Sequence, residues 1–171
     1  MKLEGKVALV TAAGRGIGKG IALALAREGA RLVVNSFAAD TTAATVAEIA
    51  AQGVDVVSLV GDITDPNKIL EMRNLALDSF GQIDILVNNV GAGPKSAIEP
   101  EDHELGMAAA LWDALYAQNV KPLVLMSEAV IPHMRERQTG KIIHISSIAG
   151  RASLSDKMLE YFVHPSYGAM K

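Results

Sequence analysis

The chain has 171 residues, half of them apolar, and carries a formal net charge of -3. This length predicts a single globular domain over residues 1–171, with enough apolar side chains for a substantial core. The weak acidic charge and the lack of basic runs interleaved with aromatics give no electrostatic reason for a nucleic-acid partner, and no apolar run approaches bilayer length, so we expect no membrane partner.

Cysteine is absent, which excludes disulfides and thiolate metal sites. The histidines fall at no metal-ligand spacing, so we expect no metal; they are His103, His133, His144 and His164. The N-terminus leads into a strand without the basic and apolar segments of a signal peptide, and we therefore expect a cytoplasmic protein.

The first predicted element is a short apolar strand over Lys6–Thr11, typical of a parallel strand that is covered on both faces. Four glycines in the segment 12–20 follow, and then an alanine-rich helix over Ile21–Arg27. The spacing is not G-x-G-x-x-G, because Lys19 and Ile21 stand where glycine is needed. A glycine turn before a helix N-terminus nevertheless suits a phosphate, so we predict phosphate binding, with a merely flexible turn as the alternative.

Strands and helices then alternate to the end of the chain. Asp40 is predicted to cap a helix that ends at Gly53, Asp65 and Pro66 to start a helix that Gly81 stops, and Pro122 to bend a long helix. The further strands are predicted over Arg31–Asn35, Val54–Val60, Ile83–Asn88 and Lys141–Ser146, and the long helix over Ala108–Arg137. This alternation indicates right-handed βαβ units, hence an α/β fold with a parallel sheet and helices on both faces.

In such sheets ligands bind at the carboxyl ends of the strands, where this sequence gathers polar residues and glycines. Asp62 follows the third strand, Asn88–Gly91 the fourth and Ser146–Ser147 the fifth. Near the end of the sequence, Tyr167 and Lys171 are four residues apart and share a face if that segment is helical. A phenol keeps its proton at neutral pH unless a nearby positive charge stabilises the phenolate, and the Lys171 ammonium would supply that charge.

These motifs together carry a family resemblance. They are Thr11–Gly18, against T-G-x-x-x-G-x-G, then Asp62, Asn88–Gly91 against N-N-A-G, Asn119, Ser147, and Tyr167 with Lys171 against Y-x-x-x-K. In this order they resemble the short-chain dehydrogenase/reductase family, in its single-domain oxidoreductase branch. Ala12 and Val90 depart from the pattern, since the family usually has glycine and alanine there. The resemblance implies a Rossmann-type doubly wound sheet of strand order 3-2-1-4-5.

The resemblance also implies a reaction, a hydride transfer between a nicotinamide and a small-molecule ketone or secondary alcohol. Ser147 would hydrogen-bond the substrate oxygen, and Tyr167 would give or take its proton. Lys171 would support the phenolate and hold the nicotinamide ribose, and Asn119 would anchor a water that links Lys171 to solvent. For Asn119 the alternative is an ordinary buried helix amide. The alternative function for the whole protein is that of a non-catalytic dinucleotide-binding protein, or of a truncated inactive protein, on the same scaffold.

The cofactor contacts implied by the resemblance are Thr11, Gly14, Arg15, Gly16, Ile17, Gly18, Ser36, Asp62, Ile63, Asn89, Gly91, Tyr167 and Lys171. The choice between NAD and NADP is argued from the end of the second strand, Asn35-Ser36-Phe37, which lacks the acid that binds a ribose 2′-hydroxyl. Arg15, in the glycine turn, is placed to meet a 2′-phosphate, with a solvated surface arginine as the alternative. The sequence thus predicts NADP in preference to NAD.

Two segments depart from the family pattern. Residues Arg151–Val163 lengthen the connection between Ser147 and Tyr167, as a lid or pocket wall or as a surface loop. Tyr161 lies in this segment and is followed four residues later by Pro165, so Tyr167 is the better catalytic candidate. The family continues beyond the lysine, and we expect these 171 residues to be part of a longer polypeptide, without the later strands. The resemblance also implies a homodimer or homotetramer, paired through the Ala108–Arg137 helix and the helix of Tyr167.

Overall fold

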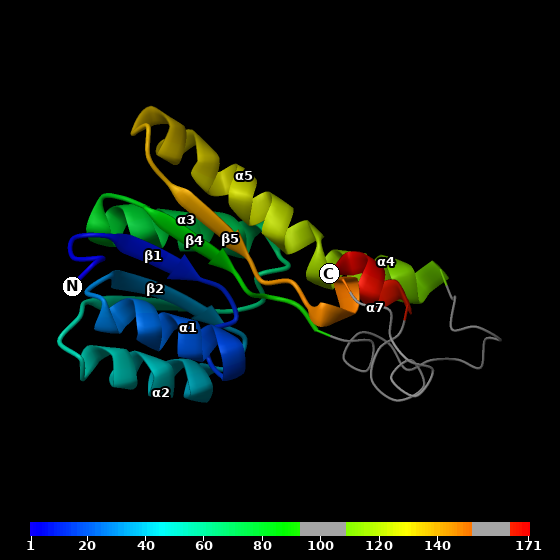
Figure 1. Ribbon diagram of the computed structural model, residues 1–171, viewed down its shortest axis with the longest axis horizontal. Helices are drawn as coiled ribbons and strands as arrows, with labels where there is room; N and C mark the ends of the chain where they lie inside the picture. The colour runs from blue at the N-terminus through cyan, green and yellow to red at the C-terminus, as the bar shows by residue number, and fades with distance from the viewer. Residues whose placement is uncertain (93–108, 152–164) are drawn as a thin grey trace.

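The computed structural model describes residues 1–92, 109–151 and 165–171. A five-stranded parallel sheet forms its centre, with the order β3-β2-β1-β4-β5 (Figure 1). The strands are β1 (Val7–Val10), β2 (Arg31–Ser36), β3 (Val56–Val60), β4 (Ile85–Asn88) and β5 (Lys141–His144). The helices are α1 (Gly16–Arg27), α2 (Ala39–Ala50), α3 (Pro66–Phe80), α4 (Ala109–Asn119), α5 (Lys121–Glu136), the 3-10 turn η2 (Ile148–Gly150) and α7 (Pro165–Met170). The α/β fold and the strand order predicted from the sequence are confirmed.

Helices cover both faces of the sheet, and the two faces of β1 belong to different cores. Val7 and Leu9 pack with residues of α3 and α5, whereas Ala8 and Val10 pack with residues of α1 and α2. All four side chains are fully buried. Because successive side chains of a strand point to opposite faces, burial on both sides requires a continuous apolar run.

The helix α3 begins and ends as the sequence predicts. The carboxylate of Asp65 accepts a hydrogen bond from Asn67 N at 2.9 Å, and Pro66 fills the first helical position. Gly81 ends the helix with a φ of +72°, and its N–H donates to the carbonyl of Leu77. The glycine adopts this left-handed conformation without the penalty that a Cβ would bring.

The prediction that Asp40 caps the second helix is wrong. The N-cap of α2 is Ala38, and the hydroxyls of Thr41 and Thr42 donate back to the Ala38 carbonyl. Asp40 lies inside the first turn. Its negative charge still stabilises the helix there by interacting with the helix dipole.

The predicted long helix is divided at Val120, so the predicted bend at Pro122 is replaced by a break just before it. α4 ends at Asn119 and α5 begins at Lys121, with Pro122 in the first turn of α5. Proline has no N–H to donate to the carbonyl four residues earlier, and it is tolerated in the first turn of a helix, where no such bond is required. Asn119 therefore sits at the very end of a helix.

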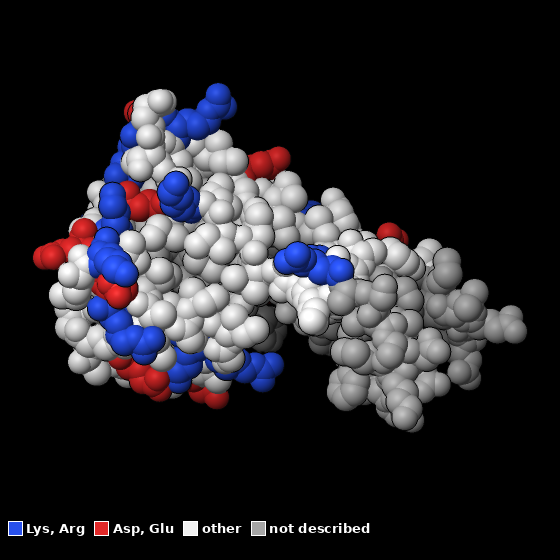
Figure 2. All heavy atoms as spheres, in the orientation of Figure 1, with Lys and Arg blue, Asp and Glu red and all other residues white. Residues whose placement is uncertain are grey.

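The carboxyl ends of the strands all point to one edge of the sheet, and α4, η2 and α7 lie beyond that edge (Figure 1). On the face seen in Figure 2, acidic and basic side chains are mixed along the end that carries the N-terminus, and the middle of the face is uncharged. Among the described residues, no helix combines the length and the apolar character needed to cross a membrane.

Candidate active site

The glycine turn after β1 is packed closely against the ends of β2 and β4. A Cβ on Gly14 would collide with the Ser36 side chain, and a Cβ on Gly18 would collide with Ala12 O and with the Asn89 amide. α1 begins at Gly16, five residues earlier than predicted, so the second half of the turn forms the first turn of the helix. The free N–H groups of that first turn therefore face the carboxyl edge of the sheet, where an anion is favoured.

Thr11 and Asn89 tie the ends of β1 and β4 together. The Thr11 hydroxyl accepts hydrogen bonds from Asn89 N at 2.9 Å and Val90 N at 3.1 Å. The Asn89 amide donates to the carbonyls of Thr11 and Ala12, each at 3.2 Å. These bonds fix the segment that follows β1 against the segment that follows β4.

Asn88 braces β4 against its neighbours, as expected of a structural residue. Its amide nitrogen lies 3.3 Å from both Leu123 O and Ser127 Oγ, and 3.2 Å from Nδ1 of His144. The side chain thus links β4 to α5 and β5.

A cleft of about 250 Å³ opens between the glycine turn, the ends of β2 and β3, and the segment after β4. Its lining is Ala12, Arg15, Asn35, Ser36, Phe37, Gly61, Asp62, Ile63, Val90, Gly91 and Gln118. Five of the predicted cofactor residues are in this set, namely Arg15, Ser36, Asp62, Ile63 and Gly91. The predicted residues Thr11, Gly14, Gly16, Ile17, Gly18 and Asn89 form the turn and its supports, outside the lining.

The end of β2 carries no acidic side chain toward this cleft. Asn35 is occupied in the protein, since its amide nitrogen donates to the carbonyls of Leu59 and Gly61. Asp62 accepts a hydrogen bond from Thr64 N at 2.9 Å. Within the described ranges Arg15 forms no ion pair, and its side chain is exposed at the mouth of the cleft.

Asn119 anchors the segment that follows β4. Its Oδ1 accepts from Ala92 N, and its Nδ2 donates to Ala92 O and Leu115 O, all at 3.0 Å. Gly91 lies beside this amide with a φ of +150°, and a Cβ there would be 2.7 Å from Asn119 Oδ1 and 2.9 Å from Lys171 Nζ. A side chain at position 91 would collide with both groups, so the glycine allows Asn119 and Lys171 to approach the same point of the chain.

Ser147 is brought to the tyrosine helix by a close backbone approach. A Cβ on Gly168 would lie 2.9 Å from Ala149 O, and a Cβ on Gly150 would lie 2.9 Å from Lys171 O. The Ser147 hydroxyl accepts from Ala149 N at 3.2 Å, and the hydroxyl of Ser146 donates to the Lys171 carbonyl. Without side chains at the two glycines, η2 and α7 pack almost in contact.

Lys171 follows directly after α7 and points back to the sheet. Its ammonium donates to Ile145 O at 3.0 Å, and burial lowers the pKa of this lysine from its ordinary value. Tyr167 is half-buried on the same helix. Beside Ser147 a second, open cavity of about 570 Å³ is lined by Ser146, Ser147, Ile148 and Arg151.

The structure thus places Asn119 at the end of α4, Ser147 just before η2, Tyr167 on α7 and Lys171 directly after α7, beyond the carboxyl ends of β4 and β5. Six lining residues were not among the predicted cofactor contacts, namely Ala12, Asn35, Phe37, Gly61, Val90 and Gln118. Ala12 and Val90 lie in the quoted motifs, and Asn35 and Phe37 lie in the segment that decided the cofactor prediction. Gly61 directly precedes Asp62, and Gln118 carried no signal in the sequence. Tyr161, His103, His164 and most of the 151–163 segment lie outside the described residues. Among the residues that are described, no group of metal-ligating side chains is found.

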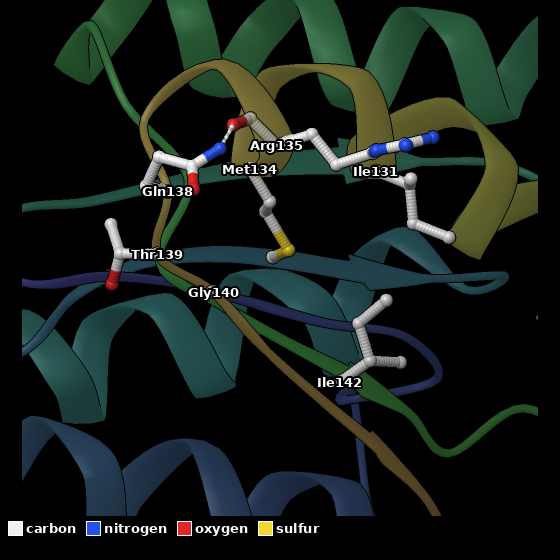
Figure 3. Close-up of a pocket in the computed structure, with 7 residues that line it drawn as sticks. All are labelled: Ile131, Met134, Arg135, Gln138, Thr139, Gly140 and Ile142. Atoms are coloured by element: carbon white, nitrogen blue, oxygen red, sulfur yellow. Dashed lines mark hydrogen bonds between the residues drawn. The ribbon is translucent and has the colours of Figure 1, made fainter.

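Another hollow, of about 370 Å³, lies between the end of α5 and the start of β5 (Figure 3). Met134 and Ile142 point into it, and Gln138 hydrogen-bonds back to Arg135 O at its rim. It is at the amino end of β5, opposite the edge that carries the predicted site residues. It is therefore no part of the candidate active site.

Comparison with known proteins agrees with this geometry. The model of a family described as short chain dehydrogenase matches residues 6–169. A 3-oxoacyl-[acyl-carrier-protein] reductase from Synechocystis sp. is 38% identical over 149 residues, which are 86% of this chain and 58% of that protein.

Two solved structures are also similar. A 7 alpha-hydroxysteroid dehydrogenase complexed with NADH and 7-oxo glycochenodeoxycholic acid superposes with a TM-score of 0.83 at 34% identity, over 99% of this chain and 61% of that one. A metagenomic short-chain oxidoreductase in complex with NADP superposes with a TM-score of 0.80 at 35% identity, over 100% of this chain and 72% of that one. The chain therefore belongs to the short-chain dehydrogenase family.

Proposed function

We propose that this chain carries the cofactor cleft and the catalytic residues of an NADP-dependent oxidoreductase that interconverts a ketone and a secondary alcohol. The observation that carries the proposal is the approach of both Asn119 and Lys171 to Gly91, a residue of the cleft lining. A protein that only senses a dinucleotide has no need of such a proton-transfer group.

The cleft is large enough for part of a dinucleotide. Its volume suits part of such a ligand, with the rest lying along the open edge of the sheet. The N-terminus of α1, and Gly16 in the turn, where a Cβ would meet nothing within 4 Å, leave room for a phosphate against the backbone. When bound, the nicotinamide would supply or accept the hydride.

The chain's own residues would position the substrate and move its proton. The Ser147 hydroxyl, which accepts a hydrogen bond from Ala149 N, remains able to donate to a substrate oxygen. Tyr167 would exchange the proton with that oxygen, and the nearby ammonium of Lys171 would stabilise the phenolate. Asn119 holds Ala92 in place by two hydrogen bonds and so fixes the segment beside Lys171.

A panel of ketones tested with NADPH, on the wild type and Tyr167→Phe, checks this assignment. We expect wild-type turnover of at least one ketone, and a loss of roughly 100-fold or more in Tyr167→Phe with cofactor binding preserved. Binding of NADPH without turnover of any ketone would instead support a non-catalytic dinucleotide-binding protein. Measurable turnover that Tyr167→Phe leaves unchanged would refute the role of the tyrosine.

The preference for NADP rests on Arg15 and Ser36 in the cleft lining and on the end of β2, Asn35-Ser36-Phe37, which carries no acid. Asp62, the acid in the lining, follows β3. An acid would attract the ribose 2′-hydroxyl of NAD, whereas a guanidinium pairs with a 2′-phosphate. Titration with NADPH and NADH tests the choice. We expect Arg15→Ala to weaken NADPH binding by about tenfold and to leave NADH binding nearly unchanged. Tighter binding of NADH than of NADPH by the wild type would reverse the assignment.

We also propose that the protein pairs through α4, α5 and α7, in a homodimer or homotetramer in the cytoplasm. Three large apolar side chains are exposed on α4 and α5, Tyr116, Val124 and Ile131. Light scattering after size exclusion should give a mass of two or four chains, and Val124→Glu should shift it toward one. A monomeric wild type would contradict the pairing.

A further inference from the structure

Two buried side-chain oxygens in the described part of the chain have no hydrogen-bond partner, Asn88 Oδ1 and Gln118 Oε1. Asn88 lies inside the protein between β4, α5 and β5. Gln118 lines the cleft, together with Gly91 and Asp62. An unpaired oxygen buried in the wall of a binding cleft is free to accept a hydrogen bond from a ligand.

The neighbouring residue shows that this is not a general feature of the end of α4. Within the described residues the Asn119 side chain makes three hydrogen bonds, to Ala92 and Leu115. Gln118 precedes it by one residue and so projects from a different side of the helix, toward the cleft. The two adjacent amides therefore differ in role: the Asn119 amide braces the protein, and the Gln118 oxygen is left open to a ligand.

A lone oxygen acceptor also limits what can bind to it. Phosphate groups at neutral pH offer negatively charged acceptors and no useful donor, so a phosphate is the wrong partner. A ribose hydroxyl or the amino group of adenine can donate. From this chemistry we infer that Gln118 is a cofactor-binding residue whose Oε1 accepts a hydrogen bond from a donor on the adenosine part of the dinucleotide.

This inference rests on the proposed function, because it takes the cleft to be a dinucleotide site. It adds a contact that the family motifs do not contain. The placement on the adenosine part follows from the shared lining, since Gln118 lies in one cleft with Arg15 of the glycine turn and with Ser36 and Asp62 at the ends of β2 and β3. The contact contributes to affinity and makes the site selective for nucleotides that carry the donor.

Gln118→Met tests the contact, because methionine keeps the length of the side chain and removes the oxygen. NADPH affinity is measured by fluorescence titration, and the melting temperature is measured with and without NADPH. We expect NADPH to bind about tenfold more weakly. The melting temperature of the free variant should equal or exceed that of the wild type, because an unpaired buried oxygen is gone, and the shift caused by NADPH should shrink.

Gln52→Met is the matched control. Gln52 is exposed beyond the end of α2 and donates to Glu48 O, so its replacement should change neither NADPH binding nor the shift. Gln118→Ala removes the oxygen without adding volume, and the same results are expected for it should the methionine variant fold poorly.

The NADPH analogue with hypoxanthine in place of adenine identifies the donor. If the adenine amino group donates, the wild type binds the analogue about tenfold more weakly than NADPH, and Gln118→Met binds both alike. If a ribose hydroxyl donates, the wild type binds both alike, and Gln118→Met loses affinity for both. Either pattern supports the contact.

Wild-type affinity for NADPH in Gln118→Met would overturn the inference and leave the proposed function standing. A weaker affinity that comes with a lowered melting temperature of the free protein in both Gln118→Met and Gln118→Ala would also overturn it, because that pattern belongs to a structural side chain. A wild type that binds no dinucleotide would overturn the proposed function itself.

Discussion

The ammonium of Lys171 donates a hydrogen bond to the carbonyl of Ile145 at 3.0 Å, which joins the end of α7 to the segment that follows β5. The same side chain approaches Gly91, after β4. A single lysine thus contacts the chain beyond two neighbouring strands at the carboxyl edge of the sheet. Its charge is held close to the helix that carries Tyr167, where the proposed proton transfer requires it.

Lys171→Met should change how stability depends on pH. Burial lowers the pKa of Lys171 in the folded protein below its ordinary value of 10.5. At a pH between the folded-state pKa and 10.5, the unfolded chain therefore binds a proton that the folded chain does not. The free energy of unfolding of the wild type therefore gains a contribution that rises with pH in this window, and the variant lacks it.

Urea unfolding of both proteins from pH 7 to 10.5 measures the effect. The difference in unfolding free energy, wild type minus variant, should increase toward pH 10.5. A difference that stays constant over this range would show that the lysine ionises alike in both states.

Gly168→Ala should damage the site while leaving the cofactor cleft intact. The new Cβ would lie 2.9 Å from the carbonyl oxygen of Ala149, and backbone atoms would have to shift to admit it. Because η2 carries Ser147 and α7 carries Tyr167, we expect turnover to fall by roughly tenfold or more and NADPH binding to change little.

Gly20→Ala is the control for this change. Gly20 is also in a helix, α1, and a Cβ there would meet nothing within 4 Å. Alanine should stabilise the protein by about 0.5–1 kcal/mol and leave turnover unchanged. Equal turnover in the two variants would mean that the contact between η2 and α7 does not set the geometry of the site.

Much of the fold is predictable from the sequence because it depends on local patterns. The apolar run from Val7 to Val10 is buried on both faces, as a central parallel strand must be. The signals at Asp65, Pro66 and Gly81 mark the ends of α3 correctly. The start of α1 was missed because glycine has a low helix propensity, whereas here tertiary packing against Asn89 selects glycine inside a helix.

The parts of the site that the sequence could not give depend on contacts between distant segments. No local pattern shows that Gly91 separates Asn119 from Lys171, or that Gly150 and Gly168 allow η2 to meet α7. Gln118 looks like any polar helix residue until its neighbours are known. The roles of the predicted catalytic residues stay predictions until the variants are measured.

Ala12→Gly should stabilise the protein. Ala12 has a φ of +51°, which places an L-residue in the left-handed region at a cost of about 1–2 kcal/mol. Glycine removes this cost but adds freedom to the unfolded chain, worth about 0.5–1 kcal/mol, so the net gain should be roughly 0.5–1 kcal/mol.

Ala13→Gly is the comparison for this change, because Ala13 is fully buried and is not among the residues with positive φ. Here glycine should destabilise by about 1 kcal/mol, through lost packing and added chain entropy. Chemical unfolding of both variants measures whether the free energy of unfolding rises in Ala12→Gly and falls in Ala13→Gly. A loss of stability in Ala12→Gly would show that the alanine methyl group contributes more by packing than the strained φ costs.

Asp84→Asn should lower stability, most of all at neutral pH. Burial alone would raise the pKa of this carboxyl, but hydrogen bonds from Val7 N and from the side chains of Arg137 and Gln82 outweigh it and hold the pKa below its ordinary value of 3.8. A carboxyl with a lowered folded pKa stabilises the protein above its ordinary pKa, and the contribution is lost as the pH falls through the folded value. The expected loss in the variant is about 2 kcal/mol at pH 7.

The difference between wild type and Asp84→Asn should shrink as the pH falls below about 4, where the carboxyl of the unfolded wild type begins to take up its proton while the folded protein, with its lowered pKa, still keeps the carboxylate. Asp78→Asn, an exposed position on α3, is the control and should shift the unfolding free energy by less than about 0.5 kcal/mol at any pH. Denaturant unfolding at pH 7 and at acid pH gives both comparisons. An equal loss at both pH values would mean that Asp84 stabilises the junction of β1, β4 and α5 by shape, not by its charge.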